Sequence, residues 1–347
     1  MQKIVLQPSG REIECEPGDT VLAALEKQGH ALPNNCRAGA CGECKVKVVS
    51  GQFDQGVVLD MALSQEERKD GYGLMCMAKP LTDLAIEWGT EDAKPLLFPP
   101  KENQYYVITE ITQPTPRIKQ LRLRPIGQAM RYWPGQYVTL GGNKETSPKR
   151  CYSIANAPRQ DGEILLQITQ VPDGKTSNWV HSCLEQGDRV QINGPYGTFI
   201  GDPTTESPVL CIAAGSGLAP ILSLAEAALR RGFRKPVTLI FSAKTEADLY
   251  EKGLMSYWET KHRNFNYKPT LTHESNSNYL NGLVPEVLPK SFKDLSAHSV
   301  FIAGSPSFVE ACIEAVKKLG APEERIFTEG YFDQAQPTTA PKSHLVS

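Results

Sequence analysis

Four cysteines in the N-terminal quarter of the chain constrain its fold more than any other feature. Cys36, Cys41 and Cys44 follow one another with the spacing C-x4-C-x2-C, and Cys76 comes after a long gap. Thiolates are soft ligands that bind iron in tetrahedral geometry, and a centre with two irons needs four of them. Three ligands from so short a segment require a loop that wraps tightly around the centre. The spacing therefore predicts a 2Fe–2S cluster, which moves one electron at a time.

Gly39 and Gly42 support the cluster interpretation. They lie between the ligands, where they allow φ > 0 and let N–H groups point at the cluster sulfurs.

Two other roles of cysteine fit the sequence less well. Structural zinc sites usually present paired C-x2-C units, whereas the loop contains a single such unit, formed by Cys41 and Cys44. Disulfides would imply a secreted chain, and no signal peptide precedes the cysteines. The remaining cysteines show no ligand spacing and are expected to be buried: Cys15, Cys151, Cys183, Cys211 and Cys312.

The composition is that of an ordinary globular protein. The 347 residues suggest two or three domains, with 40% apolar and 22% charged residues. No apolar run approaches 18 residues, so we expect no membrane span. Nine cysteines without a secretory signal indicate the reducing cytoplasm. A basic stripe with interleaved aromatic residues is missing, which argues against nucleic-acid binding.

The net charge differs between the first two segments. Residues 1–90 contain 9 Lys and Arg against 13 Asp and Glu (−4), whereas residues 101–203 contain 12 against 9 (+3). Opposite charges are typical of redox modules that dock on each other. The alternative is a chance difference on solvated surface.

Hydrophobic periodicity predicts three kinds of architecture along the chain. The N-terminal part should be a small sheet crossed by a helix over Val21–Gln28, capped by Asp19 or Thr20 and ended by Gly29. Its expected strands are Lys3–Leu6, Glu12–Cys15, Lys45–Val49 and Thr82–Glu87. Six short strands separated by turn residues then predict an antiparallel barrel: Tyr105–Ile111, Lys119–Arg124, Gln136–Leu140, Cys151–Ile154, Ile164–Gln170 and Arg189–Ile192.

From residue 208 the pattern changes to alternating strands and helices. Apolar strands at Val209–Ala213, Val237–Phe241 and Val300–Ala303, with helices at Ile221–Arg231 and Ser307–Leu319, predict a doubly wound parallel sheet. The expected division is a β-grasp ferredoxin domain (1–90), a linker (91–100), the barrel (101–203), the α/β domain (204–333) and a disordered tail (334–347).

The barrel carries residues suited to a flat, phosphorylated cofactor. Arg150 offers a planar fork for phosphate, Tyr152 a flat face and Ser153 a small donor. The run Gly174-Lys175-Thr176-Ser177 precedes a helical stretch, Asn178–Glu185, whose N-terminus favours a pyrophosphate.

A plant-type ferredoxin loop, an R-x-Y-S barrel and a dinucleotide half-fold, in this order, resemble the reductase components of bacterial multicomponent oxygenases, in the ferredoxin–NADP reductase superfamily. The resemblance covers about residues 2–332. It implies FAD, with Arg150 at its pyrophosphate, Tyr152 on the isoalloxazine ring and Ser153 at the reactive N5 edge. It also implies phosphate contacts by Gly174, Thr176 and Ser177.

The α/β domain carries the matching nucleotide loop. Gly215-Ser216-Gly217-Leu218-Ala219-Pro220 follows a strand and opens a helix, as a dinucleotide loop does. The superfamily's second signature, Cys-Gly-Pro-Pro, reads Ala303-Gly304-Ser305-Pro306 here. The thiol that normally lies beside the nicotinamide is therefore absent, and we expect hydride transfer to be less well positioned. Replacing Ala303 with Cys should then change single-turnover flavin reduction.

The C-terminal pattern is Glu329-Gly330-Tyr331. The resemblance makes Tyr331 the aromatic that shields the flavin, with Phe332 as its competitor, and Glu329 the acid beside the reacting edge. The other interpretation is a plain strand end.

The cofactor and partner expectations follow. Lys244 is the single base among two acids after the second strand, which favours NADH over NADPH. The resemblance implies electron flow from NADH through FAD and the cluster to a terminal oxygenase (di-iron, Rieske or haem). We expect a monomer, because a mobile carrier must reach its partner. The alternatives are a non-oxygenase partner such as a deoxysugar dehydratase, a redox-sensing scaffold, and a paralogue with an inactive nucleotide site.

Overall fold

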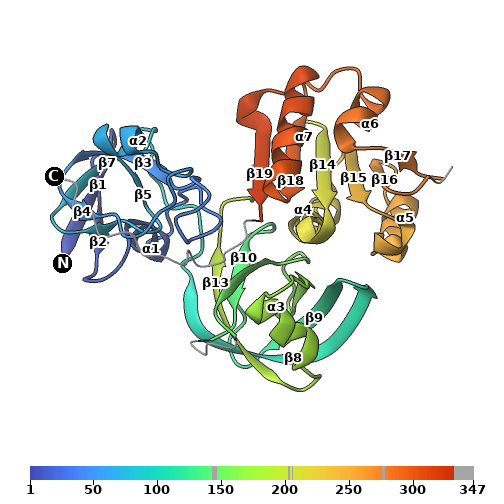
Figure 1. Ribbon diagram of the computed structural model, residues 1–347, viewed down its shortest axis with the longest axis horizontal. Helices are drawn as coiled ribbons and strands as arrows, with labels where there is room; N and C mark the ends of the chain where they lie inside the picture. Colours follow the sequence, from blue (N-terminus) through green and yellow to red (C-terminus); the bar gives the residue numbers. More distant parts are fainter. Residues whose placement is uncertain (143–146, 202–203, 205, 276–277, 332–347) are drawn as a thin grey trace. The chain divides into compact units, whose positions relative to one another are not determined.

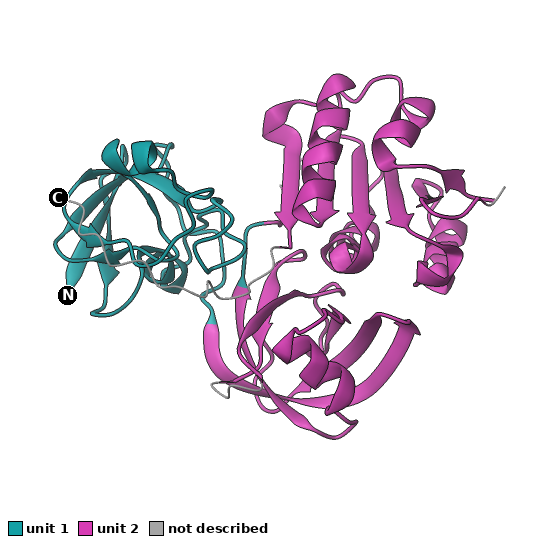
Figure 2. Cartoon of the chain, in the orientation of Figure 1, with its two compact units in different colours: residues 1–100, 196–198, 332–347 teal, residues 101–195, 199–331 magenta. Residues whose placement is uncertain are grey.

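The computed structural model describes residues 1–142, 147–201, 204, 206–275 and 278–331. The described residues divide into two compact units: those of 1–100 with 196–198 form unit 1, and those of 101–195 with 199–331 form unit 2 (Figure 2). Phe332 and the expected tail, 334–347, lie outside the described residues. No helix among the described residues is long and apolar enough to cross a membrane.

Unit 1 is a β-grasp sheet with one helix across it (Figure 1). The strand order is β2-β1-β7-β3-β5, with β1 and β7 parallel and the other pairs antiparallel, beside a two-stranded β4-β6 pair. The strands are β1 (Gln2–Gln7), β2 (Arg11–Cys15), β3 (Lys45–Ser50), β4 (Phe53–Asp54), β5 (Tyr72–Leu74), β6 (Lys79–Pro80) and β7 (Leu84–Glu87). The helices are α1 (Val21–Lys27) and α2 (Gln65–Lys69).

Helix α1 confirms the prediction for this stretch. Thr20 is the N-cap, and its Oγ1 accepts a hydrogen bond from Ala23 N at 3.2 Å. Four apolar side chains of the helix join the core of unit 1, namely Val21, Leu22, Ala24 and Leu25. The segment 91–100, expected to be a linker, is partly anchored, because the N–H groups of Leu96 and Leu97 donate to Gly29 O at 2.8 and 2.9 Å.

The first part of unit 2 is a nearly closed antiparallel barrel, as predicted. Its strand order is β11-β10-β13-β8-β9-β12, and a bridge between Ile154 and Leu166 joins the two edges. The strands are β8 (Lys101–Thr115), β9 (Ile118–Pro125), β10 (Tyr137–Leu140), β11 (Arg150–Ser153), β12 (Ile164–Thr169) and β13 (Arg189–Tyr196), and helix α3 (Lys175–Ser182) follows β12.

The second part of unit 2 is a parallel sheet with helices on both faces (Figure 1). The strands are β14 (Val209–Ala214), β15 (Val237–Ala243), β16 (Phe265–Leu271), β17 (Leu280–Asn281), β18 (Ser299–Gly304) and β19 (Ile326–Gly330). The helices are α4 (Leu218–Arg230), α5 (Lys252–Lys261), α6 (Val284–Ser291) and α7 (Pro306–Lys318), with short 3-10 turns η1 (Gly215–Gly217), η2 (Glu246–Asp248) and η3 (Glu323–Arg325). The apolar periodicity predicted β14, β15, β18, α4 and α7 within a few residues and did not predict β16, β17, β19, α5 or α6.

The order of the strands determines where the loops after β14 and β18 lie. The order β17-β16-β15-β14-β18-β19 reverses direction between β14 and β18, which is the topological switch point of a doubly wound fold. Ligands bind such sheets at the carboxyl ends of the strands flanking that point. Those ends carry Gly215 after β14 and Gly304 at the end of β18.

Three of the five other cysteines are buried as expected, and one expectation is wrong. Cys15, Cys211 and Cys312 are buried, and Cys151 is half-buried. Cys183 is exposed, because it is the C-cap of α3, where the helix ends at the surface.

Candidate functional site

The four predicted ligand cysteines come together in unit 1 as two pairs. The thiols of Cys36 and Cys41 are hydrogen-bonded, and so are those of Cys44 and Cys76. The hydrogen bond with Cys41 is the largest cause that lowers the pKa of Cys36 to about 5, and backbone N–H groups lower it further against the effect of burial. The pKa of Cys76 is lowered in the same way by its hydrogen bond with Cys44, whereas the pKa values of the two donor thiols, Cys41 and Cys44, are raised, so each pair contains one cysteine that favours the thiolate.

The loop also directs backbone donors at the sulfurs. The N–H groups of Ala38 and Ala40 lie 3.4 Å from Cys36 Sγ, and Cys76 N lies 3.4 Å from Cys44 Sγ. Gly39 has φ +68°, and a Cβ there would lie 2.9 Å from Val57 O, so a side chain would displace the loop.

The arrangement fits a centre with two irons. Among the residues described, no three or more His, Cys, Asp or Glu side chains are grouped so that they could hold one metal ion. Two thiol pairs side by side are instead the donor set of a 2Fe–2S cluster, with one pair for each iron.

An ion pair between Arg37 and Glu26 joins the cysteine loop to helix α1. Arg37 Nη1 donates to Glu26 Oε1 of α1 at 2.6 Å, and the Glu26 side chain is 3% exposed. Glu26 Oε2 is buried without a hydrogen-bond partner among the described residues, and burial raises the pKa of Glu26 against the opposing effect of Arg37. The Arg37 side chain therefore helps to hold the cysteine loop against α1. Its neighbour Ala38 is exposed, so another protein can contact it.

In unit 2, three predicted residues meet at one point. Ser153 Oγ, at the end of β11, donates to Glu329 Oε1 of β19 at 2.6 Å and lies 3.2 Å from the hydroxyl of Tyr331. Glu329 Oε2 is buried and has no hydrogen-bond partner among the described residues. Burial raises the pKa of Glu329 to about 7, and the hydrogen bond from Ser153 opposes that rise.

The strand that carries Glu329 also carries the link to the nucleotide side. Ala303 pairs with Glu329 and Gly304 with Gly330 in the parallel β18–β19 ladder, and Tyr331 N donates to Gly304 O at 2.9 Å. The candidate flavin residues and the second nucleotide signature are therefore adjacent. The Ala303 side chain is fully buried, so position 303 supplies packing and no polar group.

The predicted phosphate residues of the barrel are adjacent as well. Thr176 Oγ1 donates to Pro148 O, which ties the first turn of α3 to the approach to β11 and Arg150. Ser177 Oγ donates to Gly174 O and accepts from Val171 N, both at 3.2 Å, so its hydroxyl shapes the turn. Gly174 is the N-cap and provides no capping side chain, which suits an anion at this helix terminus.

Two glycines of the nucleotide loop have different reasons to be glycine. Gly215 has φ +56°, and a Cβ there would meet nothing within 4 Å, so the loop borders open space that a ligand can occupy. A Cβ on Gly217 would lie 2.2 Å from Ala303 O, so only glycine lets η1 pack on β18. Pro220 is buried in the first turn of α4.

Lys244 follows β15 and is exposed. Its acidic neighbour Glu246 receives hydrogen bonds from Lys252 at 3.1 Å and from the hydroxyl of Tyr279 at 3.0 Å. An acid held in this place disfavours a second phosphate on a bound nucleotide.

Hydrogen bonds that the sequence did not predict join the barrel to the nucleotide loop. The Tyr250 hydroxyl lies 2.9 Å from Gln167 Oε1 of β12 and 3.0 Å from Gly215 O, and its single proton is shared between these two acceptors. Thr169 Oγ1 donates to Ser216 Oγ at 2.9 Å. Burial raises the pKa of Tyr250 well above its usual value, so it stays a donor.

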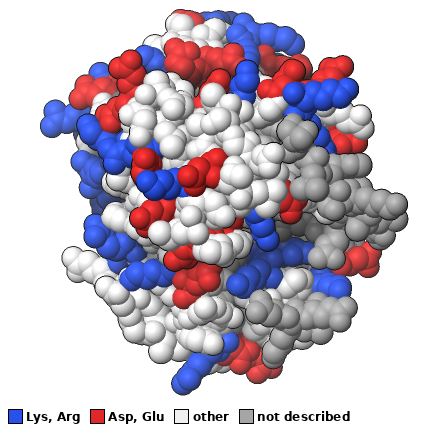
Figure 3. Space-filling model, turned by 90° about the vertical axis from the view of Figure 1, so that its left-hand side faces the viewer, with Lys and Arg blue, Asp and Glu red and all other residues white. Residues whose placement is uncertain are grey.

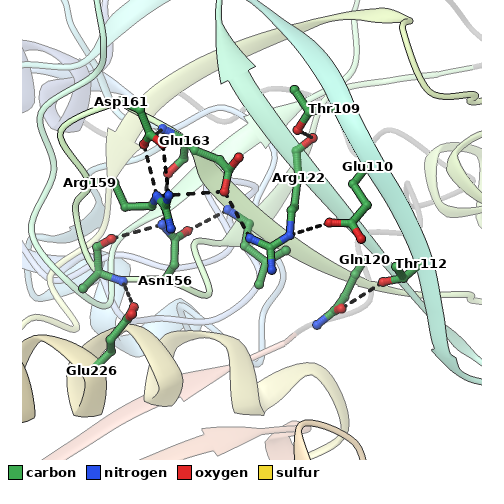
Figure 4. Close-up of polar contacts among 12 residues, drawn as sticks. Thr109, Glu110, Thr112, Gln120, Arg122, Asn156, Arg159, Asp161, Glu163 and Glu226 are labelled. Carbon is green, nitrogen blue, oxygen red and sulfur yellow. Dashed lines mark hydrogen bonds and ion pairs between the residues drawn. The ribbon is translucent and has the colours of Figure 1, made fainter. Parts of the chain in front are cut away.

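A second missed contact joins the barrel to helix α4. Glu226 Oε2 accepts from Ala157 N at 2.7 Å, and Ser223 Oγ donates to Asn156 O at 2.7 Å. Figure 4 shows Asn156 and Glu226 beside the ion pairs of Arg159 with Asp161 and of Arg122 with Glu163. No local sequence signal marks these residues, because their partners lie far along the chain.

The predicted electrostatic docking of the first two modules stays a prediction. On the face drawn in Figure 3, acidic and basic side chains of the described residues are interspersed and separated by uncharged surface. Net charge alone therefore does not define a docking patch on that face.

Comparisons with known proteins agree with this geometry. Residues 4–81 match the 2Fe-2S iron-sulfur cluster binding domain family, residues 107–200 the oxidoreductase FAD-binding domain family and residues 211–314 the oxidoreductase NAD-binding domain family. The reductase subunit of the aromatic O-demethylase of Amycolatopsis sp. is 33% identical over 93% of this chain and 96% of its own length.

Two further relatives cover the same span. The reductase component DmpP of the phenol 2-monooxygenase of Pseudomonas sp. is 32% identical over 96% of this chain and 95% of its own length. The crystal structure of the Amycolatopsis cytochrome P450 reductase GcoB superposes with a TM-score of 0.87 at 30% identity, covering 95% of this chain and 98% of that one.

Proposed function

Because the chain belongs to the family of reductase components in which a 2Fe–2S domain precedes FAD- and NAD-binding domains, we propose that it passes electrons from NADH to a separate terminal oxygenase. The chain is an NAD(P)H-dependent oxidoreductase of the ferredoxin reductase type. Relatives named as reductase components of a demethylase and a monooxygenase support an oxygenase as the acceptor.

The observation that carries this proposal is the meeting of Ser153, Glu329 and Tyr331 beside β18. The flavin motif, the C-terminal motif and the second nucleotide signature lie far apart in sequence, yet one hydrogen bond from Tyr331 N to Gly304 O joins the last two. A site that transfers electrons between a nucleotide and a flavin needs this junction.

The proposed ligand assignments follow from the geometry above. Cys36, Cys41, Cys44 and Cys76 would hold the cluster. Arg150 and the first turn of α3 would hold the FAD phosphates, and Tyr152 its ring. The nucleotide would lie over Gly215, Ser216, Gly217, Pro220, Lys244, Ala303 and Gly304. When bound, NADH supplies an electron pair, FAD accepts the pair and gives single electrons, and the cluster carries them one at a time.

The protein's own groups supply position and a proton site. With its pKa raised to about 7, Glu329 exists in both protonation states near neutral pH, so it can hold or release a proton. The Ser153 hydroxyl joins this carboxyl to the Tyr331 hydroxyl and fixes its orientation. Tyr250 and Thr169 hold η1 against the barrel, which fixes the distance between nucleotide and flavin sites.

Stopped-flow mixing under anaerobic conditions tests the proposal. NADH should bleach the flavin and then the cluster band, and NADPH should do so at least tenfold more slowly at equal concentration. Adding a terminal oxygenase with its aromatic substrate should then couple NADH oxidation to product formation. Equal rates with both nucleotides would overturn the NADH assignment, and NADH oxidation without coupled product would overturn the oxygenase assignment.

A further inference from the structure

A short apolar strip lies exposed in unit 1. Val57, Leu59 and Met61 are 39%, 37% and 82% exposed, whereas Val58 and Leu63 are buried in the core of the unit. The strip contains three of the twelve large apolar side chains that are exposed among the described residues, within five positions. Exposed apolar residues scattered singly need no explanation, but a contiguous group marks an interaction site.

The strip borders the cysteine loop directly. Leu59 N donates to Gly39 O at 3.0 Å, and Val57 O lies 2.9 Å from where a Cβ of Gly39 would be. Ala62, just after the strip, approaches Gly42 in the same way, with its carbonyl oxygen at 3.4 Å. A protein that covers the strip therefore lies against the loop that carries three of the four thiols.

The strip is also held in place by its own segment. Ala62 N and Leu63 N both donate to Leu59 O, at 2.9 and 3.1 Å, and Arg68 Nε donates to Leu63 O at 3.2 Å. The three side chains are thus presented by an ordered backbone, which lowers the entropy cost of covering them.

The charges around the strip select the kind of partner. Five acids and two bases occur in residues 54–70, and the Asp60 side chain, between Leu59 and Met61, is 75% exposed although it pairs with Arg68. A partner that covers the strip meets the Asp60 carboxylate and a segment of net charge −3, which an apolar recess edged by Lys and Arg complements. We propose that Val57, Leu59 and Met61 form the docking surface for the electron-acceptor protein, whose own recess is apolar and rimmed by Lys and Arg.

This inference rests on the proposed function and names the surface through which electrons leave. Contact at the strip shortens the path from the thiols to the acceptor. The negative charge of residues 54–70, Asp60 above all, speeds the encounter with a basic partner and makes its rate fall with salt.

The test replaces Val57, Leu59 and Met61 together with Ser in the cofactor-loaded full chain, with Met61→Ser as a single variant. Val49→Ser is the matched control, because Val49 is 56% exposed and lies four residues beyond Lys45 along β3, about 13 Å from the start of the strand next to Cys44. Cytochrome c, a basic one-electron haem protein, is the acceptor probe, and ferricyanide is the small-molecule probe.

We expect the triple variant to lower the second-order rate constant for cytochrome c reduction at least tenfold, with a smaller loss for Met61→Ser. Reduction of the cluster by NADH, NADH-dependent ferricyanide reduction and the Val49→Ser variant should be unchanged. An unaltered cytochrome c rate would overturn the proposal. Slower reduction of the variant's cluster by NADH would overturn it as well, because the strip would then serve the chain's own flavin domain. Failure of NADH to reduce the cluster of the parent protein would count against the proposed function instead.

Discussion

Glu329 gives the most quantitative prediction, because its carboxyl is buried at the centre of the candidate site. Its pKa rises from 4.5 to about 7 because burial penalises the charged form more than the Ser153 hydrogen bond favours it. Each unit of pKa is worth about 1.4 kcal/mol, so the difference of about 2.5 units corresponds to about 3.5 kcal/mol. The group gains stability by keeping its proton in the folded state. That stability is fully present below pH 4.5 and is lost as the pH rises through 7.

The perturbation is Glu329→Gln, which keeps an acceptor for Ser153 and cannot ionise. For a unit of this size, about 3.5 kcal/mol corresponds to a shift in Tm of roughly 7–14 °C. Relative to the parent, the Tm of the variant should therefore rise by that amount between pH 4.5 and pH 8.5. Scanning calorimetry of the FAD-loaded protein measures it at several pH values. Glu324→Gln, at an exposed glutamate just before the same strand, is the matched control and should show no such trend. Parallel Tm curves for parent and Glu329→Gln would refute the reasoning.

Three further predictions concern the supports of the sites. Arg37→Ala leaves the Glu26 carboxylate buried without its cation, which should cost about 3–5 kcal/mol and release iron and sulfide on gel filtration, and the double variant with Glu26→Gln should retain them. Iron loss from both alike would contradict this. Gly217→Ala brings a Cβ within 2.2 Å of Ala303 O and should displace η1. The Kd for NADH should therefore rise at least about tenfold in equilibrium titrations, with constant FAD content. An unchanged Kd would show that η1 can move freely. Tyr250→Phe removes hydrogen bonds to Gln167 and Gly215, worth about 1–2 kcal/mol, and should slow single-turnover flavin reduction about tenfold with FAD binding intact. The control is Tyr267→Phe, because that buried hydroxyl has no hydrogen-bond partner among the described residues. An equal loss of the flavin-reduction rate in both variants would show that Tyr250 acts only through packing.

Local signals in the sequence located much of the fold. The cysteine spacing predicted a loop of three thiols with Cys76 as the fourth ligand, and apolar periodicity located β14, β15 and β18 because buried parallel strands read as continuous apolar runs. Strands β16 and β19 were missed because each mixes polar with apolar residues, as in Phe265–Leu271 and Ile326–Gly330. Their place in the sheet comes from pairing with neighbours and not from local pattern.

The candidate site shows the same limit. Ser153 and Glu329 are 176 residues apart, and only the family resemblance suggested that they meet. Glu26 lies on a helix face whose burial depends on the return of the cysteine loop, so its sequence neighbours gave no sign of an ion pair. Tyr250 acts through Gly215, 35 residues away, and no spacing rule connects them. Long-range hydrogen bonds of this kind require the folded chain.

The most direct test of the account is low-temperature EPR of the purified protein after anaerobic reduction with NADH, with iron and labile sulfide measured on the same sample. The account predicts the signal of a reduced 2Fe–2S cluster, with about two irons and two sulfides per chain, that appears only when FAD is present. A protein that holds zinc in place of iron, or a cluster that stays oxidised while NADH bleaches the flavin, would contradict the path from nucleotide to cluster.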